Sequence, residues 1–454
     1  MLNNSIKTTI FSTLICISPG MMAADLMDVW QSAQSRDPEY ISSRFNELAS
    51  EKKLDQSRAL WLPNVFVSAT VGSMSSNSST VGAQFISGSG SGPATFNTSI
   101  NNGMLSRYVI TATQPIYDLE KLAQTRQLKL AALAGNLSGQ QSQQKLILLV
   151  ADRYFSVLTS QENLRLAQKL ENSIQKTHAE VLRRLRVGDA TQTDAQETLE
   201  RLNEIKAKII NAQVDLKSKE LALQDLLGKS DFLKKIRPNL KSNNSDLKNI
   251  NAYIEQMKSN NLQLKIMAVM KDIAKQEADK YLAQSSIRLN AIAQASKDNL
   301  NGSGDFGSAS NNSTSTLLGI QLNVPLFTGG YRSAKLAESL QLIEKSQADL
   351  DQISLKIEQN IRLIWFTLNA SKERFNILEN TLKISQARLA STIKQHELGA
   401  RTTLEVLAAQ IDAVNAEQML YTEKVQYILN HLNLNALTGN LSEQDLKLAN
   451  NYLE

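Results

Sequence analysis

The chain carries one sequence pattern twice, and this repeat constrains its fold more than any other feature. "VGDATQTD" at residues 187–194 resembles "LGARTTLE" at residues 398–405, which puts Gly188 and Gly399 at equivalent positions. Further matches at the same spacing are Tyr154-Phe155 with Trp365-Phe366 and Leu227-Gly228 with Thr438-Gly439. Such a repeat indicates a duplicated structural unit, and glycine permits the sharp bend on which each copy is centred.

Each copy contains a long helical pattern that ends at one of these glycines. Between Ile353 and Ile393 the apolar residues recur about every 3.6 positions, the period of a nearly straight α-helix. We predict two helical hairpins, with long arms over 119–187 and 331–398 and shorter return arms over 190–228 and 402–437. At about 1.5 Å per residue, each long arm would span roughly 100 Å. Two further helices, over 38–60 and 252–284, are expected to extend the shorter arms.

Four segments between the predicted helices alternate apolar and polar residues, as half-buried β-strands do. They lie at 65–71, 105–112, 287–295 and 318–324. Polar loops are predicted within each pair, over 72–103 and 296–315. Strands of about 9–11 residues can cross a bilayer at a tilt, with one face toward lipid and the other toward water. A soluble antiparallel sheet with long loops is the alternative that this alternation also allows.

Neither the strands nor the helices can be complete in one copy of the chain. Small closed barrels need about eight strands, and an open sheet edge in lipid leaves backbone groups unpaired at a cost of several kcal/mol each. A long helix with a single apolar stripe likewise needs neighbours. We therefore predict an α+β membrane protein in which a symmetric oligomer encloses a channel. It would combine a long α-helical barrel of duplicated hairpins with a transmembrane antiparallel β-barrel completed by oligomerisation, four strands coming from each chain.

The chain passes from a predicted strand into a long helix at two similar motifs, "QPIYD" and "VPLFTGG". Proline has no backbone N–H, so Pro115 and Pro325 are expected to end ladder pairing. Gly329 and Gly330 permit the backbone angles of a tight turn. We predict a strand-to-helix junction at each motif, made twice because the whole unit is repeated.

The composition and motifs argue against several classes of function. The net charge of +5 over 454 residues is mild and spread along the chain, which does not favour nucleic-acid binding. After the N-terminal segment no apolar run reaches about 18 residues, so no transmembrane helix is expected. We find no nucleophile elbow, phosphate-binding loop or metal-ligand spacing, and predict no enzymatic activity, cofactor or metal. The basic cluster at 183–186 and the three histidines, His178, His396 and His431, are expected on solvated helix surfaces.

Residues 1–23 have the pattern of a secretory signal peptide. Lys7 precedes a short apolar stretch, and Ala23 and Ala24 offer small residues for cleavage. Cys16, the only cysteine, lies inside that segment. The mature chain would then contain no thiol or disulfide. An N-terminal anchor is the alternative interpretation.

Together these features resemble the outer-membrane efflux proteins of the TolC family. The resemblance is carried by "ADLMDVWQSAQSRDPEY" (24–40), "LWLPNVFVSA" (60–69), both junction motifs and both glycine-centred bends, and covers nearly the whole mature chain. It implies a homotrimer with a twelve-stranded barrel in the cell outer membrane and a helical barrel in the periplasm. It also implies partners: outer-membrane lipid, a periplasmic adaptor (membrane fusion) protein, and a proton-driven or ABC inner-membrane pump.

The repeat and the resemblance together divide the chain into consecutive segments. They are the signal peptide (1–23), an N-terminal helical segment (24–60), the first β-hairpin of the barrel (61–116), the first long helical hairpin (117–228), an equatorial linker (229–250), a helix (251–284), the second β-hairpin (285–328), the second long helical hairpin (329–438) and a C-terminal equatorial tail (439–454). The two equatorial assignments come from the resemblance alone.

The resemblance also places candidate gate residues at the two bends, where the family's channel is constricted at its periplasmic entrance. Aligned on Gly399, Arg401 takes a position that ties neighbouring helices together. Its expected polar partners are Thr193 and Asp194 at the first bend. Glu405 takes a position where the family commonly has an acidic ring.

A structural interpretation of these acidic residues stays open beside the functional one. Thr402 with Glu405 and Thr191 with Asp194 both have the spacing of a capping box, in which the carboxylate returns to the helix start. A second acidic ring of the family would fall on Ala408. The resemblance therefore implies one acidic ring here rather than two.

The function that follows is a passive trimeric channel-tunnel for multidrug efflux, type I protein secretion, or both. The alternative is a periplasmic coiled-coil adaptor or structural protein of an envelope-spanning complex. An adaptor would have one helical hairpin flanked by compact β-rich modules, whereas this chain has two hairpins and bilayer-length strands. The sequence leaves open the cargo, the identity of the pump and adaptor, and the energy source of the pump.

Overall fold

The computed structural model describes residues 24–453 apart from residues 88–89, 229–232 and 237–246, with the side chains of 83–94 and 96 left aside. The predicted signal peptide with Cys16 lies outside the described residues, as does most of the predicted linker 229–250. The chain forms two compact units. Unit 1 comprises the described residues within Met1–Arg44, Gln140–Leu262 and Leu355–Glu454, and unit 2 those within Phe45–Gly139 and Gln263–Ser354.

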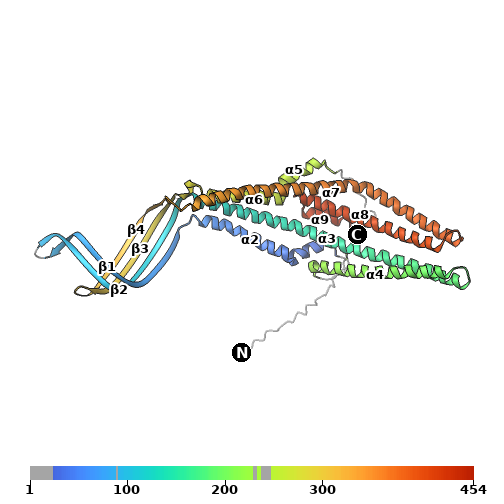
Figure 1. The fold of residues 1–454 in the computed structure, drawn as a ribbon, viewed down its shortest axis with the longest axis horizontal. Coiled ribbons are helices and arrows are strands. Elements are labelled where there is room, and N and C mark those ends of the chain that lie inside the picture. Colours follow the sequence, from blue (N-terminus) through green and yellow to red (C-terminus); the bar gives the residue numbers. More distant parts are fainter. Residues whose placement is uncertain (1–23, 88–89, 229–232, 237–246, 454) are drawn as a thin grey trace, which may run out of the picture. The chain divides into compact units, whose positions relative to one another are not determined.

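The described residues form long helices and one sheet (Figure 1). The helices are α1 (Leu26–Arg36), α2 (Pro38–Ala59), α3 (Leu119–Arg186), α4 (Gln192–Leu227), α5 (Ile250–Asn260), α6 (Leu262–Asp279), α7 (Tyr331–Glu397), α8 (Thr403–Leu437) and α9 (Glu443–Asn450), with a short 3-10 helix at Ala283–Ser286. The strands are β1 (Asn64–Ser87), β2 (Gly90–Asp118), β3 (Arg288–Gly304) and β4 (Gly307–Asn323). Duplicated helical hairpins with a four-stranded antiparallel sheet confirm the predicted fold class.

The arms of the predicted hairpins form as continuous helices, whereas the single helix predicted over 252–284 is divided into α5 and α6 and ends at Asp279. α3, α4, α7 and α8 begin and end within two residues of the predicted arms. Between α5 and α6 the chain leaves the helical region at Asn261, with φ −58° and ψ 123°. The Asn261 Nδ2 donates to the backbone oxygen of Leu437 at 2.7 Å. The break in the helix at Asn261 thus coincides with a side-chain hydrogen bond to α8, and hydrophobic periodicity gives no sign of that contact.

The apolar core of unit 1 surrounds Trp30 of α1 and the aromatic pair Tyr154-Phe155 of α3, all of them buried. Leu446 of α9 is buried in the same cluster. The Tyr154 hydroxyl donates to the backbone oxygen of Lys234 at 3.0 Å, so this buried polar group has a partner. Burial raises the pKa of Tyr154. One apolar cluster therefore joins α1 and α9, which come from opposite ends of the described chain, to the middle of α3.

The two copies of the repeat are not packed alike. Phe155 is fully buried, whereas Phe366 at the equivalent position is 61% exposed. The Trp365 indole donates to the backbone oxygen of Lys248 at 3.0 Å. In both pairs the rings meet edge to face, with interplanar angles of 80°. Duplication therefore preserves the local geometry, while the neighbouring elements decide burial.

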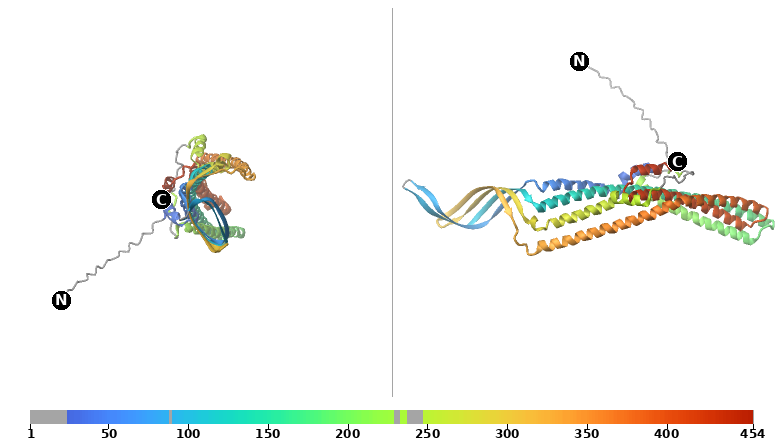
Figure 2. Two further views of the ribbon diagram at one scale, coloured as in Figure 1. Left: turned by 90° about the vertical axis from the view of Figure 1, so that its left-hand side faces the viewer. Right: turned by 90° about the horizontal axis from the view of Figure 1, so that it is seen from above.

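Unit 2 contains an antiparallel sheet with strand order β1-β2-β3-β4, so β1 and β4 are its edges. The strands run side by side with a pronounced twist (Figure 2), the usual consequence of L-residue sterics. Successive residues of a strand point to opposite faces. Pairs such as Val67 with Ile110 and Ile110 with Ala295 put apolar residues on one face of neighbouring strands.

The segments predicted as polar loops, 72–103 and 296–315, are largely strand. β1 continues to Ser87 and β3 to Gly304, each paired with the strand that follows. Ladder hydrogen bonds use backbone groups, so Ser, Thr and Asn side chains do not prevent pairing. Apolar alternation reports that one face is buried, and it fades where both faces meet water. Alternation therefore marked only part of each strand.

Gly439→Ala is expected to destabilise the protein more than Gly228→Ala. Both glycines follow a hairpin helix with positive φ, 79° and 80°, so alanine adds backbone strain of about 1–2 kcal/mol at either site. At Gly439 the new Cβ would also stand 2.3 Å from the Asn260 backbone oxygen, whereas at Gly228 it would meet the end of the flexible Arg36 side chain. Guanidinium unfolding measures both free energies. Equal losses would show that the Asn260 backbone yields.

Candidate functional site at the hairpin ends

The two hairpins of unit 1 close with the same kind of turn, between α3 and α4 and between α7 and α8 (Figure 1). Gly188 and Gly399 lie at these bends with φ of 83° and 74°. Glycine adopts this left-handed region without the strain that other residues would bear. The structure therefore places both predicted bend glycines at the turns.

Each bend is followed by a capping box. The Thr191 hydroxyl accepts from the Asp194 N–H at 3.1 Å, and the Asp194 carboxylate accepts from the Thr191 N–H at 2.9 Å. Thr402 and Glu405 repeat the arrangement at 3.3 and 2.8 Å. The threonine N–H holds the pKa of each carboxyl below its ordinary value, and Arg401 lowers the pKa of Glu405 further. The capping interpretation is confirmed for both carboxylates.

Arg401 bonds within its own hairpin. Its Nη1 donates to Glu405 Oε1 at 2.5 Å, and its Nε donates to Gln395 Oε1 at 3.1 Å. Arg401 was expected to contact Thr193 and Asp194 at the other bend, but within one chain it bonds to Glu405 and Gln395 instead. A tie between Arg401 and the first bend of a neighbouring copy stays a prediction.

The first hairpin contacts the second through an ion pair, a small apolar cluster and a polar contact near the bends. Glu417 of α8 forms an ion pair with Arg165 of α3 at 2.7 Å. Leu407 of α8 packs into a small apolar cluster with residues of α3 and α4. At the last turns of α3 and α7, Arg184 Nη1 lies 3.3 Å from His396 Nε2. The contact beside the bends is therefore polar.

A cleft of about 890 Å³ lies between α3 and the second hairpin near the bends. Among its lining residues are Thr177, Arg184, His396 and Gln410. Gln410 Nε2 is 3.4 Å from Thr177 Oγ1, whereas the buried Gln410 Oε1 has no hydrogen-bond partner among the described residues. An unpaired buried amide oxygen reduces stability. This end of unit 1 is therefore less completely packed than its core.

Sequence reasoning missed the residues that bring the hairpins together. Arg184 and His396 were both expected on solvated surfaces, yet both are half-buried and contact each other. His431 was also expected on a surface, but it packs edge-on against Tyr427, and burial lowers its pKa. Charge and spacing along one segment carry no signal for such contacts, because the partner lies far away in the sequence.

The two strand-to-helix junctions of unit 2 differ, although their sequences are similar. β4 ends before Pro325, and Gly329 and Gly330, both at positive φ, lie in the loop that leads to α7. β2 instead continues past Pro115 to Asp118 and runs directly into α3. A register shift next to Pro115 accommodates a residue that lacks an N–H. The prediction that Pro115 ends ladder pairing was wrong for this reason.

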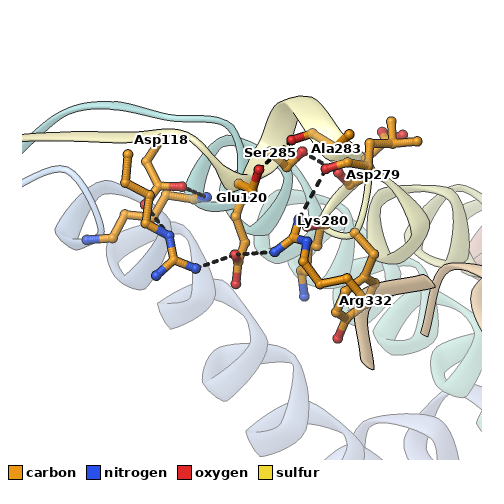
Figure 3. Close-up of polar contacts among 12 residues, drawn as sticks. Asp118, Glu120, Asp279, Lys280, Ala283, Ser285 and Arg332 are labelled. Atoms are coloured by element: carbon orange, nitrogen blue, oxygen red, sulfur yellow. Dashed lines mark hydrogen bonds and ion pairs between the residues drawn. The ribbon is translucent and has the colours of Figure 1, made fainter. Parts of the chain in front are cut away.

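Charged side chains link these junctions (Figure 3). Glu120 of α3 accepts from Arg288 of β3 at 2.6 Å and lies 3.7 Å from Arg332 of α7. Arg332 also donates to the backbone oxygens of Lys280 and Leu282, at 2.7 and 3.1 Å, just beyond the end of α6. The Glu120 carboxylate near the start of α3 therefore lies close to the start of α7, and Arg332 connects it to the backbone just beyond the end of α6.

The described residues contain neither a membrane-spanning helix nor a cluster of metal-ligating side chains. Among the helices there, none combines the length and apolar character that crossing a membrane would require. Nor do three or more His, Cys, Asp or Glu side chains gather there in a way that could hold a metal ion. The chemistry at the hairpin ends is that of carboxylates, guanidinium groups and an imidazole in hydrogen bonds, which can join helices reversibly.

The cap at Glu405 predicts a pH-dependent contribution to stability. Hydrogen bonds to the charged form lower its pKa from 4.5 on folding, so the stabilisation is fully present above the unfolded pKa and is lost as pH falls through the folded one. Glu405→Gln should reduce the free energy of unfolding at pH 7, and its difference from wild type should shrink progressively below pH 4.5. Guanidinium unfolding at several pH values measures this difference.

Glu373→Gln, which changes an exposed glutamate of α7, is the matched control for Glu405→Gln. It should alter the free energy of unfolding little at any pH. A Glu405→Gln difference that stays constant from neutral to acidic pH would contradict the role of the cap.

Comparisons with known proteins agree with this architecture. The chain matches the family described as "Outer membrane efflux protein" over residues 29–229 and 253–440. It is 25% identical over 442 residues to outer membrane protein TolC of Escherichia coli (strain K12), which covers 95% of this chain and 85% of that protein. It is 23% identical over 450 residues to proteases secretion protein PrtF of Dickeya chrysanthemi, which covers 97% of this chain and 94% of that protein.

Solved structures share the fold. The crystal structure of CusC aligns with a TM-score of 0.72 at 14% identity, over 92% of this chain and 93% of that chain. The outer membrane protein VceC of Vibrio cholerae aligns with a TM-score of 0.72 at 14% identity, over 91% and 96%. The TolC relative and the family match place the protein in the outer membrane. Because that match covers most of its length, the chain belongs to the outer membrane efflux protein family.

Proposed function

We propose that the chain assembles as a homotrimer that forms a channel-tunnel across the outer membrane and the periplasm. Substrates handed over by an inner-membrane pump and a periplasmic adaptor protein would leave through it without further energy input. Its relatives support this class of function, since PrtF is named a proteases secretion protein and TolC an outer membrane protein. Passage through a duct needs no reacting group, so the proposal includes no catalytic activity.

The observation that carries the proposal is the two-faced sheet. One row of paired residues on its apolar face consists of Val65, Ala112, Ala293 and Leu318. On the opposite face, Arg107 pairs with Asp298 at 2.8 Å, at the level where Lys297 ends the apolar face. An exposed apolar face suits lipid, and a face with paired charges suits a water-filled interior.

The edges of the sheet support assembly from several copies. β1 and β4 each pair on one side only, which leaves a row of backbone donors and acceptors unpaired within the chain. In lipid each unpaired group is costly, and pairing β4 of one copy with β1 of the next satisfies both edges. Three copies would supply about twelve strands, enough for an open interior, because barrels of about eight strands are filled by side chains.

The helices support the same assembly. Leu363, Phe366 and Ile384 of α7, all in unit 1, are 66, 61 and 68% exposed. Large apolar side chains gathered along one helix favour burial against a partner. A helix from a neighbouring copy that packs on α7 would cover them. Strands and helices thus favour one arrangement for separate physical reasons.

Export from intact cells tests the proposal directly. A strain that lacks this chain should lose efflux of a fluorescent dye, secretion of a protease, or both, because the outer membrane then has no duct for them. A plasmid that carries the wild-type chain should restore what was lost. Unchanged export of dyes and proteins from the deletion strain would argue against the proposed function.

Adjacent leucines on opposite faces of β4 provide a second test. Leu318 pairs with Ala293 on the apolar face, and Leu317 pairs with Gln294 on the other. Arginine on the lipid side of a barrel costs up to about 2–4 kcal/mol per chain, so Leu318→Arg should sharply reduce folded protein in the outer-membrane fraction. Leu317→Arg, the matched control, should assemble normally. Heat-modifiable gel mobility measures assembly, and equal defects in both variants would contradict this assignment of faces.

A further inference from the structure

We propose that Arg184 and His396 form an acid-sensitive latch that joins the two hairpins beside their bends at neutral pH and releases them when His396 is protonated. The inference rests on the proposed channel function and adds a mode of regulation to it. It starts from one contact, which joins two residues 212 positions apart in the sequence.

The geometry fixes the protonation state that the contact needs. Arg184 Nη1 lies 3.3 Å from His396 Nε2. A guanidinium has only donors, so Nε2 must accept, and the neutral ring then carries its proton on Nδ1. The same Nε2 lies 3.2 Å from the hydroxyl of Thr403, the first residue of α8. The latch therefore joins the last turns of α3 and α7 at the start of α8.

Protonation removes the basis of this contact. Imidazole is the side chain whose charge ordinarily changes between about pH 5 and 8. A protonated Nε2 cannot accept from Arg184, and two cations would then stand in contact and repel each other. The Thr403 hydroxyl can still accept from the imidazolium. His396 is thus expected to stay with its own hairpin and to separate from Arg184.

The other charged groups at the cleft determine how strong the release is. They are Lys176, Glu180 and Asp189 on the side of the first hairpin and Glu397 beside His396. Glu180 is already engaged in an ion pair within α3. α8 faces the cleft with the uncharged side chains of Val406 and Gln410. A carboxylate that moved onto the imidazolium would oppose release, and hydrogen exchange at the bends would then be equal at both pH values.

Apart from the latch, few side chains hold the hairpin ends together, and the large apolar ones that do are the buried Val181 of α3 and Val406 and Leu407 of α8. Gln410 reaches Thr177 only at 3.4 Å, and its Oε1 is unpaired among the described residues. Regions with few buried apolar contacts are the ones that open locally at low cost in free energy. Loss of one hydrogen bond here can therefore shift the balance between joined and separated ends.

Other titrating groups near the bends can be told apart from His396. Hydrogen bonds keep the pKa of Asp194 and of Glu405 below their ordinary values of 3.8 and 4.5, so both stay ionised between about pH 5.5 and 7.5. His178 bonds to Thr198 within the first hairpin at 2.7 Å. It is therefore a matched control, a histidine of the same unit that does not join the hairpins.

The first measurement is the conductance of the full-length protein in planar lipid bilayers at about pH 7.5 and 5.5. We expect open-state occupancy of wild type to rise about threefold to tenfold on acidification, the scale set by repulsion between two cations in contact when water screens them fully. His396→Asn should abolish the rise, because an amide does not ionise. Arg184→Gln should abolish it too, because its amide can donate to the neutral ring and accept from the charged one. His178→Asn should keep the full rise.

Hydrogen exchange of the bend peptides gives a readout that needs no working channel. After correction for the intrinsic pH dependence, residues 180–190 and 392–402 should exchange several-fold faster at the lower pH in wild type and His178→Asn, but not in His396→Asn. Equal exchange at both pH values, or an equal increase in His396→Asn, would overturn the latch whatever the conductance shows. Faster exchange in a protein that passes no ions would support the latch while ending the proposed channel function.

Discussion

The unpaired backbone edges of β1 and β4 determine the rest of the structure. A four-stranded sheet with one apolar face can enter lipid only if both edges find partners, because no water is present there to satisfy them. Copies of the same chain offer those partners, since a free β4 edge and a free β1 edge occur in each. In the proposed assembly, a helix of a neighbouring copy would likewise cover the exposed apolar side chains of α7.

The two copies of the repeat share their local structure, but the segments that surround them differ. The capping boxes at Thr191 and Thr402 have the same hydrogen bonds, because a cap depends only on residues within one turn. The aromatic pairs keep their ring geometry, yet Phe155 is buried and Phe366 is exposed. Pro115 lies inside a strand beside a bulge, whereas Pro325 follows the end of one. Features fixed by near neighbours are thus repeated, and features fixed by distant segments are not.

The same distinction explains what the sequence could predict. The long helices were predicted to within two residues, because periodicity and the glycine bends are local signals. The strands were predicted too short, because apolar alternation stops where lipid or core no longer contacts one face. The break at Asn261 and the contact between Arg184 and His396 had no local signal, since the partner of each lies far along the chain. The capping boxes were predicted from residue spacing alone. Thr193 and Asp194 were expected as partners of Arg401, but within one chain Arg401 bonds to Glu405 and Gln395. Spacing along one segment does not show how far away the other bend lies.

Packing within unit 1 indicates which part of it can move. Around Trp30 and Tyr154 the helices bury large apolar side chains, and separating them would expose surface at about 25 cal/mol for each Å². At the bends the hairpins meet through partly exposed polar contacts, and such contacts are typically worth about 0–1 kcal/mol. The caps hold each turn together within its own hairpin, so the hairpin ends can separate without unfolding. A firmly packed core with more loosely joined, well-capped ends is therefore suited to the opening proposed at the bends, and the place where large apolar side chains give way to polar ones would set how far such a motion could reach.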